Sequence, residues 1–173
     1  MLCPEASLGK RSLERLHSIV MNKQVGVISD THGLLRPEAL AALASVDLIV
    51  HAGDIGSAEL LEALAAIAPV VAVRGNNDRE PWTASLPETV STEIAGVRLY
   101  VVHDLKTLPT PPEQLGADVV ISGHSHKPKV ERRSGTLLLN PGSAGPRRFS
   151  LPVTLGYLTV VAGKPTAEIK RLL

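Results

Sequence analysis

Two short motifs in this sequence each contain two candidate metal ligands separated by a single residue. Asp30 and His32 form the first pair, and His124 and His126 form the second. In an extended segment, residues two apart point to the same side, so each pair could address one ion together. Carboxylate oxygens and imidazole nitrogens bind divalent transition metals. The Asp30 and His32 pair alone is weak evidence, because surface Asp and His pairs are common, whereas the two histidines after a buried strand are the sharpest single signal in the chain.

Three further residues could add donors to the same site. Asp54 follows Gly53 after an apolar run, where either a metal or a helix N-terminus could compensate its charge. Asn76 offers a neutral oxygen, although its neighbours also favour an ordinary turn. His103 ends another apolar run. Nitrogen and oxygen donors without a thiolate suit Mn²⁺, Fe, Co or Zn rather than a structural zinc site.

The apolar runs before these residues are predicted strands. They are short and rich in β-branched residues, as buried strands are. Because ligands bind at the carboxyl ends of strands in α/β sheets, the strand ends predict one common site. The runs cover residues 24–29, 47–51, 70–74, 98–102 and 119–122.

The remaining elements predict two sheets with helices outside them. Helices are expected at residues 37–45, after Pro37 as a first-turn residue, and at 58–68, with Ser57 as the N-cap. This alternation of strand and helix indicates parallel strands. The second half favours hairpins around residues 95–96, 134–135 and 163–165, and a short helix near 112–115.

Composition narrows the class of protein. The 173 residues suit one domain, and a net charge of +1 gives no field for polyanions. Aromatic residues make up 2% of the chain, so a base-stacking nucleic-acid surface is disfavoured. The single cysteine excludes an intrachain disulfide, and no run has the roughly 20 apolar residues of a membrane helix. We therefore expect a cytoplasmic protein without a membrane partner.

A boundary is expected near residue 22. Residues 1–22 carry no motif and read as an N-terminal extension, with a peripheral helix or a loose arm as the simplest interpretation. An alternative is that Met21 is the natural start. Residues 23–173 hold all the candidate ligands and form the predicted domain.

The ordered motifs D-x-H, G-D, G-N-x-D, H and G-H-x-H resemble those of the small bacterial and archaeal calcineurin-like metallophosphoesterases, relatives of the retromer scaffold subunit. The resemblance runs from about residue 24 to the C-terminus. It implies an α/β fold, a four-layer α-β-β-α sandwich of mixed β-sheets. It also implies two divalent metal ions, with Mn²⁺ expected and Fe, Zn, Co or Ni as alternatives.

The resemblance implies a role for each motif residue. One metal would be held by Asp30, His32 and His126, the second by Asn76, His103 and His124, with Asp54 bridging both. The implied reaction is phosphodiester hydrolysis by in-line attack of a metal-bound hydroxide on a small phosphoester. The catalytic residues would be Asp54, Asn76, Asn77 and His103. No cofactor besides the metals is expected, and a homo-oligomer stays open.

Two other functions remain alternatives. A protein-interaction scaffold could keep the fold, as the retromer subunit does, and a metal-binding regulatory domain could keep the ions without turnover. A scaffold needs no ligands, whereas here all seven are present, which favours the enzyme.

Two residues depart from the family pattern. Asn77 stands where larger members have a histidine that contacts phosphate and protonates the leaving group. Asp104 follows His103 where glycine is common, which puts a carboxylate near the mouth of the site. These departures leave the substrate class open.

Several other polar residues lie outside the seven candidate ligands. His51 is expected in the core or beside the site, and His17 lies in the extension. A turn at residues 140–143 is expected to pack near the site. Four arginines could bind phosphate, although solvated surface charge is the favoured interpretation. They are Arg74, Arg79, Arg147 and Arg148.

Overall fold

The first strand, β1 (Lys23–Ile28), lies in the middle of a five-stranded mixed sheet. The computed structural model describes residues 22–173, so the expectations for residues 1–21, including the extension helix and His17, lie outside the described residues. β1 pairs in parallel with its neighbour β2, β2 pairs in parallel with β3, and β9 and β10 continue the sheet antiparallel on the other side. The added strands are β2 (Leu48–His51), β3 (Val70–Ala72), β9 (Thr154–Val161) and β10 (Lys164–Arg171).

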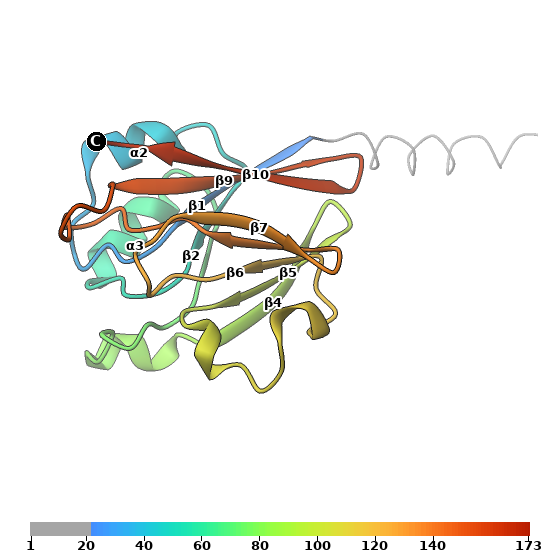
Figure 1. The fold of residues 1–173 in the computed structure, drawn as a ribbon. Coiled ribbons are helices and arrows are strands. Elements are labelled where there is room, and N and C mark those ends of the chain that lie inside the picture. Colours follow the sequence, from blue (N-terminus) through green and yellow to red (C-terminus); the bar gives the residue numbers. More distant parts are fainter. Residues whose placement is uncertain (1–21) are drawn as a thin grey trace, which may run out of the picture.

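A second five-stranded mixed sheet faces the first, and the two are stacked in Figure 1. Its strand order is β4-β5-β6-β8-β7, with β5, β6 and β8 parallel to one another. Its strands are β4 (Thr89–Ile94), β5 (Val97–Val102), β6 (Val119–Ile121), β7 (Lys129–Arg133) and β8 (Thr136–Asn140).

Alternating side chains divide the core into two clusters. Val25 and Val27 of β1 point between the sheets and pack with Leu99 and Ile121 of the second sheet. Ile28 points the other way, toward the helices. β1 is therefore buried on both faces, as the apolar run predicted.

Two α-helices cover the outer face of the first sheet, as Figure 1 shows. α2 (Pro37–Leu43) begins with the predicted proline, and α3 (Ala58–Ala65) begins after Ser57, whose hydroxyl accepts from the Leu60 amide at 3.3 Å. The expected short helix near residues 112–115 is a 3₁₀-helix, η3 (Pro112–Gln114), which packs on β8 of the second sheet. The predicted α/β sandwich of mixed sheets is thus confirmed, with a thinner outer layer over the second sheet.

The three predicted hairpins are present, and each turns through two residues with positive φ, although the third turns at residues 162–163 rather than 163–165, because Lys164 and Pro165 already pair in β10. The pair Ala95 and Gly96 has φ of 48° and 79°, and Ser134 with Gly135 and Ala162 with Gly163 follow the same pattern. This conformation matches the twist of paired strands, which is why glycine ends each turn.

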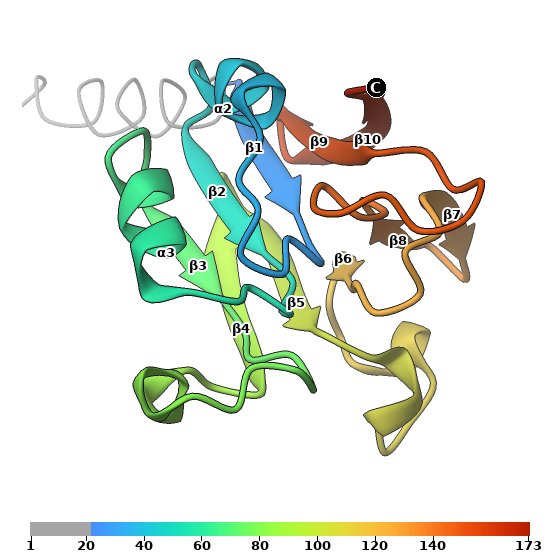
Figure 2. The same ribbon diagram turned by 90° about the vertical axis from the view of Figure 1, so that its left-hand side faces the viewer.

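β1, β2, β3, β5 and β6 end at one edge of the sandwich, the edge that Figure 2 faces. The segments that follow them carry the candidate ligands. Two more 3₁₀-helices, η1 (Pro81–Ser85) and η2 (Leu105–Thr107), follow β3 and β5, and sequence periodicity did not reveal them. Among residues 22–173, no helix has the length and apolar character to cross a membrane.

Gly26 allows α2 to lie close to β1, because a Cβ there would overlap the Leu43 side chain. We predict that Gly26→Ala lowers the free energy of unfolding by about 1–3 kcal/mol, since α2 must move to relieve the overlap. Urea denaturation measures it. Gly156→Ala in β9 is the matched control, because its Cβ would meet Leu139 Cδ1 at 3.2 Å, a milder contact. Equal destabilisation by both changes would contradict this account of the α2 packing.

Candidate metal centre

The loop after β1 is fastened to the loop after β2 by backbone hydrogen bonds. The amide of Asp30 donates to the carbonyl of Gly53 at 3.0 Å, and that of His32 donates to the carbonyl of Asp54 at 2.9 Å. These bonds continue the parallel pairing of β1 and β2 past the strand ends. They bring Asp30, His32 and Asp54 to one place.

Five of the seven predicted ligands have a left-handed backbone. Their φ values are 54° for Asp30, 47° for His32, 54° for Asp54, 65° for His124 and 56° for His126. The extended geometry that we expected for the two paired motifs is therefore wrong: tight left-handed turns, not a pleat, bring the paired side chains together. Such residues cost about 1–3 kcal/mol each and persist only where the surroundings hold them, so they cluster at functional sites.

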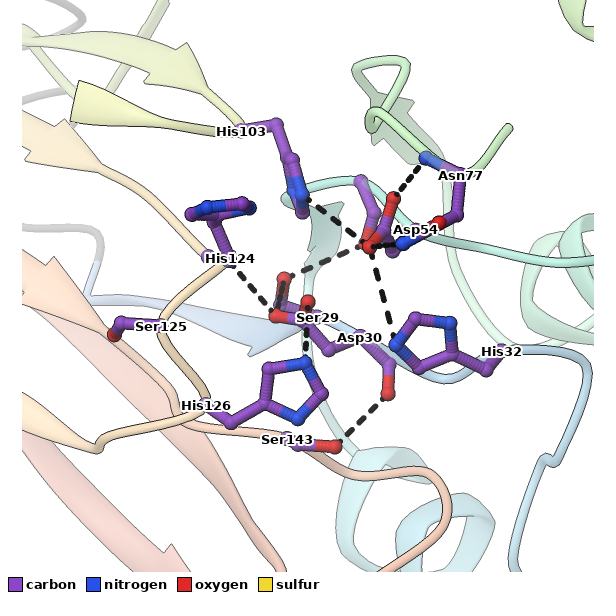
Figure 3. A network of polar contacts seen from close by, with 12 residues as sticks. Ser29, Asp30, His32, Asp54, Asn77, His103, His124, Ser125, His126 and Ser143 are labelled. Carbon is purple, nitrogen blue, oxygen red and sulfur yellow. Dashed lines mark hydrogen bonds and ion pairs between the residues drawn. The ribbon is translucent and has the colours of Figure 1, made fainter. Parts of the chain in front are cut away.

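Asp30, His32 and His126 form one group of donors, seen in Figure 3. His126 Nε2 lies 3.2 Å from Asp30 Oδ1. The rings of His32 and His126 are stacked, with centroids 5.4 Å apart. One ligand atom from each residue lies within 4.8 Å of the others, which is close enough for a single ion.

Asn76, His103 and His124 form a second group. Asn76 Oδ1 lies 3.1 Å from His103 Nε2 and 3.0 Å from His124 Nδ1. His103 Nδ1 lies 2.7 Å from the carbonyl of Ala52, which fixes a proton on Nδ1 and turns Nε2 toward the site. With Nδ1 committed to that carbonyl, Nε2 is the atom that could hold either a proton shared with Asp54 or, once deprotonated, a cation.

Asp54 lies between the two groups. Its Oδ2 is 3.4 Å from His103 Nε2 and 3.8 Å from His32 Nε2. The amide of Asn77 donates to Oδ1 at 2.8 Å, and the Asn77 side chain donates to Oδ2 at 2.6 Å. Burial raises the pKa of Asp54, but the hydrogen bonds from His103 and Asn77 outweigh it, so the pKa lies well below its usual value. Asp54 is therefore a carboxylate at any physiological pH.

The two histidines beside Asp54 have pKa values shifted in opposite directions. Burial lowers the pKa of His32, and the positive charge of Arg148 acts in the same direction against the raising effect of Asp54. Burial also lowers the pKa of His103, but its hydrogen bonds to Asp54 and the Ala52 carbonyl raise it more. A metal ion bound here would therefore have to displace a proton from His103 Nε2, which faces Asp54.

Unpaired buried atoms show that the residues fit a bound cation. Among the described residues, four buried side-chain atoms lack a hydrogen-bond partner, and three belong to this site: Asp30 Oδ1, His32 Nε2 and His126 Nδ1. An unsatisfied buried polar atom costs about 1–3 kcal/mol. Nitrogen and oxygen atoms gathered around two carboxylates would be satisfied by divalent transition metals. The structure therefore brings all seven predicted ligands together in an arrangement that suits metal ions.

Two buried serines hold Asp30 in place, and no sequence signal pointed to the role of Ser29. The Ser29 hydroxyl donates to Asp30 Oδ2 at 2.7 Å, and the His124 amide donates to the same oxygen at 3.0 Å. Ser143, from the expected turn at residues 140–143, donates to the Asp30 carbonyl at 2.9 Å. That turn does pack against the site, as predicted.

His51 stabilises the junction of the two loops. It is fully buried, and burial lowers its pKa to about 3, so the ring is neutral. Its Nδ1 accepts from the Gly53 amide at 3.2 Å, so Nε2 carries the proton and donates to Thr31 Oγ1 at 2.8 Å. The expectation of a core histidine beside the site is confirmed.

Asp78 joins the loop after β2 to the loop after β3. Its Oδ1 accepts from the amides of Ile55, at 2.8 Å, and Gly56, at 3.1 Å, and its Oδ2 accepts from the Gly75 amide at 2.8 Å. The carboxylate thus replaces strand pairing where the strands have ended. It sets the spacing between the segments that carry Asp54 and Asn76.

The four arginines differ in their surroundings. Arg74 pairs with Glu88 at 2.7 Å, which supports the surface-charge interpretation for it. Arg79 Nε donates to the carbonyl of Asn76 at 3.2 Å. Arg147 and Arg148 are exposed, and Arg148 is near enough to His32 to affect its pKa.

Comparison with known proteins agrees with this geometry. Residues 24–163 match the calcineurin-like phosphoesterase superfamily domain. A protein from Methanothermobacter thermautotrophicus named "Probable metallophosphoesterase" is 39% identical over 159 residues, spanning 85% of this chain and 91% of its own length. A phosphodiesterase from Methanocaldococcus jannaschii is 28% identical, over 84% of this chain and 91% of its own.

A solved structure shares the fold. Vacuolar protein sorting 29 from Cryptosporidium parvum superposes with a TM-score of 0.70 at 22% identity, covering 87% of this chain and 97% of that one. At this identity the likeness supports the sandwich alone.

We predict that Asp78→Asn destabilises the protein by about 1–3 kcal/mol, because an amide nitrogen would face the Gly75 amide and leave it without an acceptor. Urea denaturation in the presence of EDTA measures the loss without a contribution from metal. Glu80→Gln, an exposed acidic residue two positions later, is the control and should change stability little. A loss no larger than that of the control would show that Asp78 does not join the loops.

Proposed function

The chain belongs to the calcineurin-like phosphoesterase superfamily, and on that premise we propose that it is a binuclear-metal-dependent phosphodiesterase that cleaves P–O bonds by in-line attack of water. As a member of this family it is a metal-dependent phosphoesterase, a hydrolase of ester bonds. The observation that supports two ions most directly is the position of Asp54, between two groups of converging donors.

The proposed ligand assignment follows the two groups. Asp30, His32 and His126 would hold one ion, and Asn76, His103 and His124 the other. Asp54, a carboxylate at physiological pH, would contact both and offset their mutual repulsion. When bound, the ions would supply Lewis acidity, lowering the pKa of a coordinated water and neutralising charge on the phosphate.

Mn²⁺ is the proposed metal, with Fe, Zn, Co or Ni as alternatives. The site offers nitrogen and oxygen donors and no thiolate. Such a set excludes no metal of this group, so the choice depends on geometry and availability.

Asn77 is proposed to orient the bridging carboxylate and to donate to the substrate phosphate. Its side-chain amide donates one hydrogen to Asp54 Oδ2, which leaves the second amide hydrogen for another acceptor. An amide cannot protonate a departing alkoxide near neutral pH. The proposed reaction therefore depends on leaving groups that depart without help.

The scaffold alternative has weaker support. It rests on the shared sandwich, which needs none of the seven donors. In this protein the seven donors converge, and three of their buried atoms lack a hydrogen-bond partner among the described residues. Metal-stimulated hydrolysis of bis(4-nitrophenyl) phosphate would separate the enzyme from both the scaffold and the regulatory domain. Two bound ions without turnover under any divalent metal would favour the regulatory domain.

We predict that Asp54→Asn is the most damaging conservative change at the site. An amide keeps the shape of the side chain but loses the negative charge between the ions. Loss of a residue that only hydrogen-bonds to a metal ligand lowers activity by about 10- to 100-fold, and turnover of Asp54→Asn should fall by more than that. Hydrolysis rate and metal content, measured by elemental analysis, should fall together. Asp118→Asn, an exposed carboxylate paired with Arg98, is the matched control. Wild-type turnover with full metal content in Asp54→Asn would refute the bridging assignment.

We also predict a steep dependence of rate on the pKa of the leaving group, because no residue is proposed to protonate it. Phosphodiesters of aryl alcohols with graded pKa should show kcat falling as the pKa of the leaving alcohol rises. Asn77→His should flatten this dependence by supplying a proton donor. A flat dependence in the unaltered protein would count against the proposed role of Asn77.

A further inference from the structure

A cavity of about 560 Å³ opens beside the second group of donors. Asn76, His103 and His124 contribute to its wall, so whatever fills it lies against that part of the site. The lining also includes Pro81 and Ala84 of η1, the 3₁₀-helix drawn in green at the lower left of Figure 2. This volume is in the range of pockets that bind organic ligands, and it exceeds the space that a phosphate needs.

The wall combines apolar surface with an excess of acidic groups. Pro81, Ala84 and Val102 supply apolar contacts. The acidic residues in the lining are Asp78, Glu80, Glu88 and Asp104, against the basic residues Arg74 and Arg79.

Both arginines already interact with neighbouring groups of the protein. Arg74 is paired with Glu88, and Arg79 is bonded to the Asn76 carbonyl through Nε. Arg74 and Glu88 therefore offset each other, and the remaining acidic groups in the lining, Asp78, Glu80 and Asp104, outnumber Arg79.

Asp104 is held in a fixed direction at the junction of cavity and site. Its Oδ1 accepts from the Lys106 amide at 3.0 Å, as the N-cap of η2, and its Oδ2 lies 3.6 Å from His124 Nε2. These two contacts orient the carboxylate toward His124. An anionic group placed there would meet a like charge, which is unfavourable in a partly enclosed space.

From these observations, and resting on the proposed phosphodiesterase function, we propose that the cavity binds one of the two ester substituents of the substrate. That substituent would be a neutral or positively charged organic group, packed on Pro81, Ala84 and Val102 and screened from anionic competitors by Asp104. The group in the cavity would be the one that stays on phosphorus, so the protein would prefer diesters over monoesters, because a monoester carries only its leaving group and leaves the cavity empty. It would also disfavour diesters whose substituent carries a further carboxylate or phosphate.

The test places a large side chain in the cavity by substituting an exposed residue of its lining. Ala84→Trp would add a ring on η1 where the cavity lies, whereas Ser85→Trp adds the same ring to the neighbouring residue, which does not line it. The substrates are bis(4-nitrophenyl) phosphate, 4-nitrophenyl phosphate, 4-nitrophenyl phosphorylcholine and a matched diester whose substituent ends in a carboxylate. The readout is kcat/KM with Mn²⁺, together with the metal content of each variant.

In Ala84→Trp we expect the ratio of diester to monoester kcat/KM to fall by about tenfold or more, as lost packing in a specificity pocket produces. Ser85→Trp should leave the ratio unchanged. The unaltered protein should prefer the choline diester to the carboxylate diester. An unchanged ratio in Ala84→Trp, or preference for the carboxylate diester, would overturn the proposal.

Failure of the proposed function would look different. In that case no ester would be cleaved with any divalent metal, and calorimetry would measure binding of the intact bis(4-nitrophenyl) phosphate. Weaker binding to Ala84→Trp than to Ser85→Trp would still support the cavity as the site for the substituent, whereas equal binding would reject it.

Discussion

Asp30 and Asp54 are two buried carboxylates that share the end of one parallel strand pair, and their charge governs the surrounding structure. Asp30 is fully buried and Asp54 is 2% exposed, with ligand atoms of both within 4.8 Å of His103. Two such charges in a low-dielectric environment need compensation. Hydrogen bonds to Ser29, Asn77 and backbone amides supply part of it, but Asp30 Oδ1 has none. A cation bound among the carboxylates would supply the rest of the compensation.

Glycines let the segments from both sheets approach this charge. A Cβ on Gly53 would lie 2.6 Å from His103 Nδ1, and a Cβ on Gly123 would lie 2.9 Å from Asp30 Oδ2. Gly75 is equally confined, since its Cβ would overlap Asp54. The sandwich supplies rigid strand ends, and the absence of side chains at these points lets histidines of the second sheet reach carboxylates of the first. The left-handed backbone conformation of the ligand residues is a local strain that accompanies this close packing.

The sequence predicted the strands, the hairpins and the gathering of the ligands, because apolar runs and turn residues are local signals. It could not predict what holds the ligands. Asp78 looks like a turn residue in the sequence, yet it accepts hydrogen bonds from backbone amides 22 and 23 residues away. Every residue except proline has such an amide, so the sequence does not show which amides it will bind. Ser143 supports Asp30 from 113 residues away. The left-handed φ at Asp30 and His126 arises from tertiary contacts, so a local pattern suggested extended backbone instead. The metal-binding role of the seven residues remains a prediction.

Few side chains near the site are free to donate a proton, and this limits the chemistry that the site can perform. His103 Nδ1 is committed to the Ala52 carbonyl, and its Nε2 faces Asp54 and Asn76. His51, with a pKa lowered to about 3, is buried behind Thr31 and remains neutral. His32 is a weaker base than free histidine and faces Asp54. Each of these imidazoles has a structural or ligand position, and Asn77 has no acidic proton to give. Under the proposed function, substrate choice would then depend on how readily the leaving group departs and on which substituent the neighbouring cavity accepts.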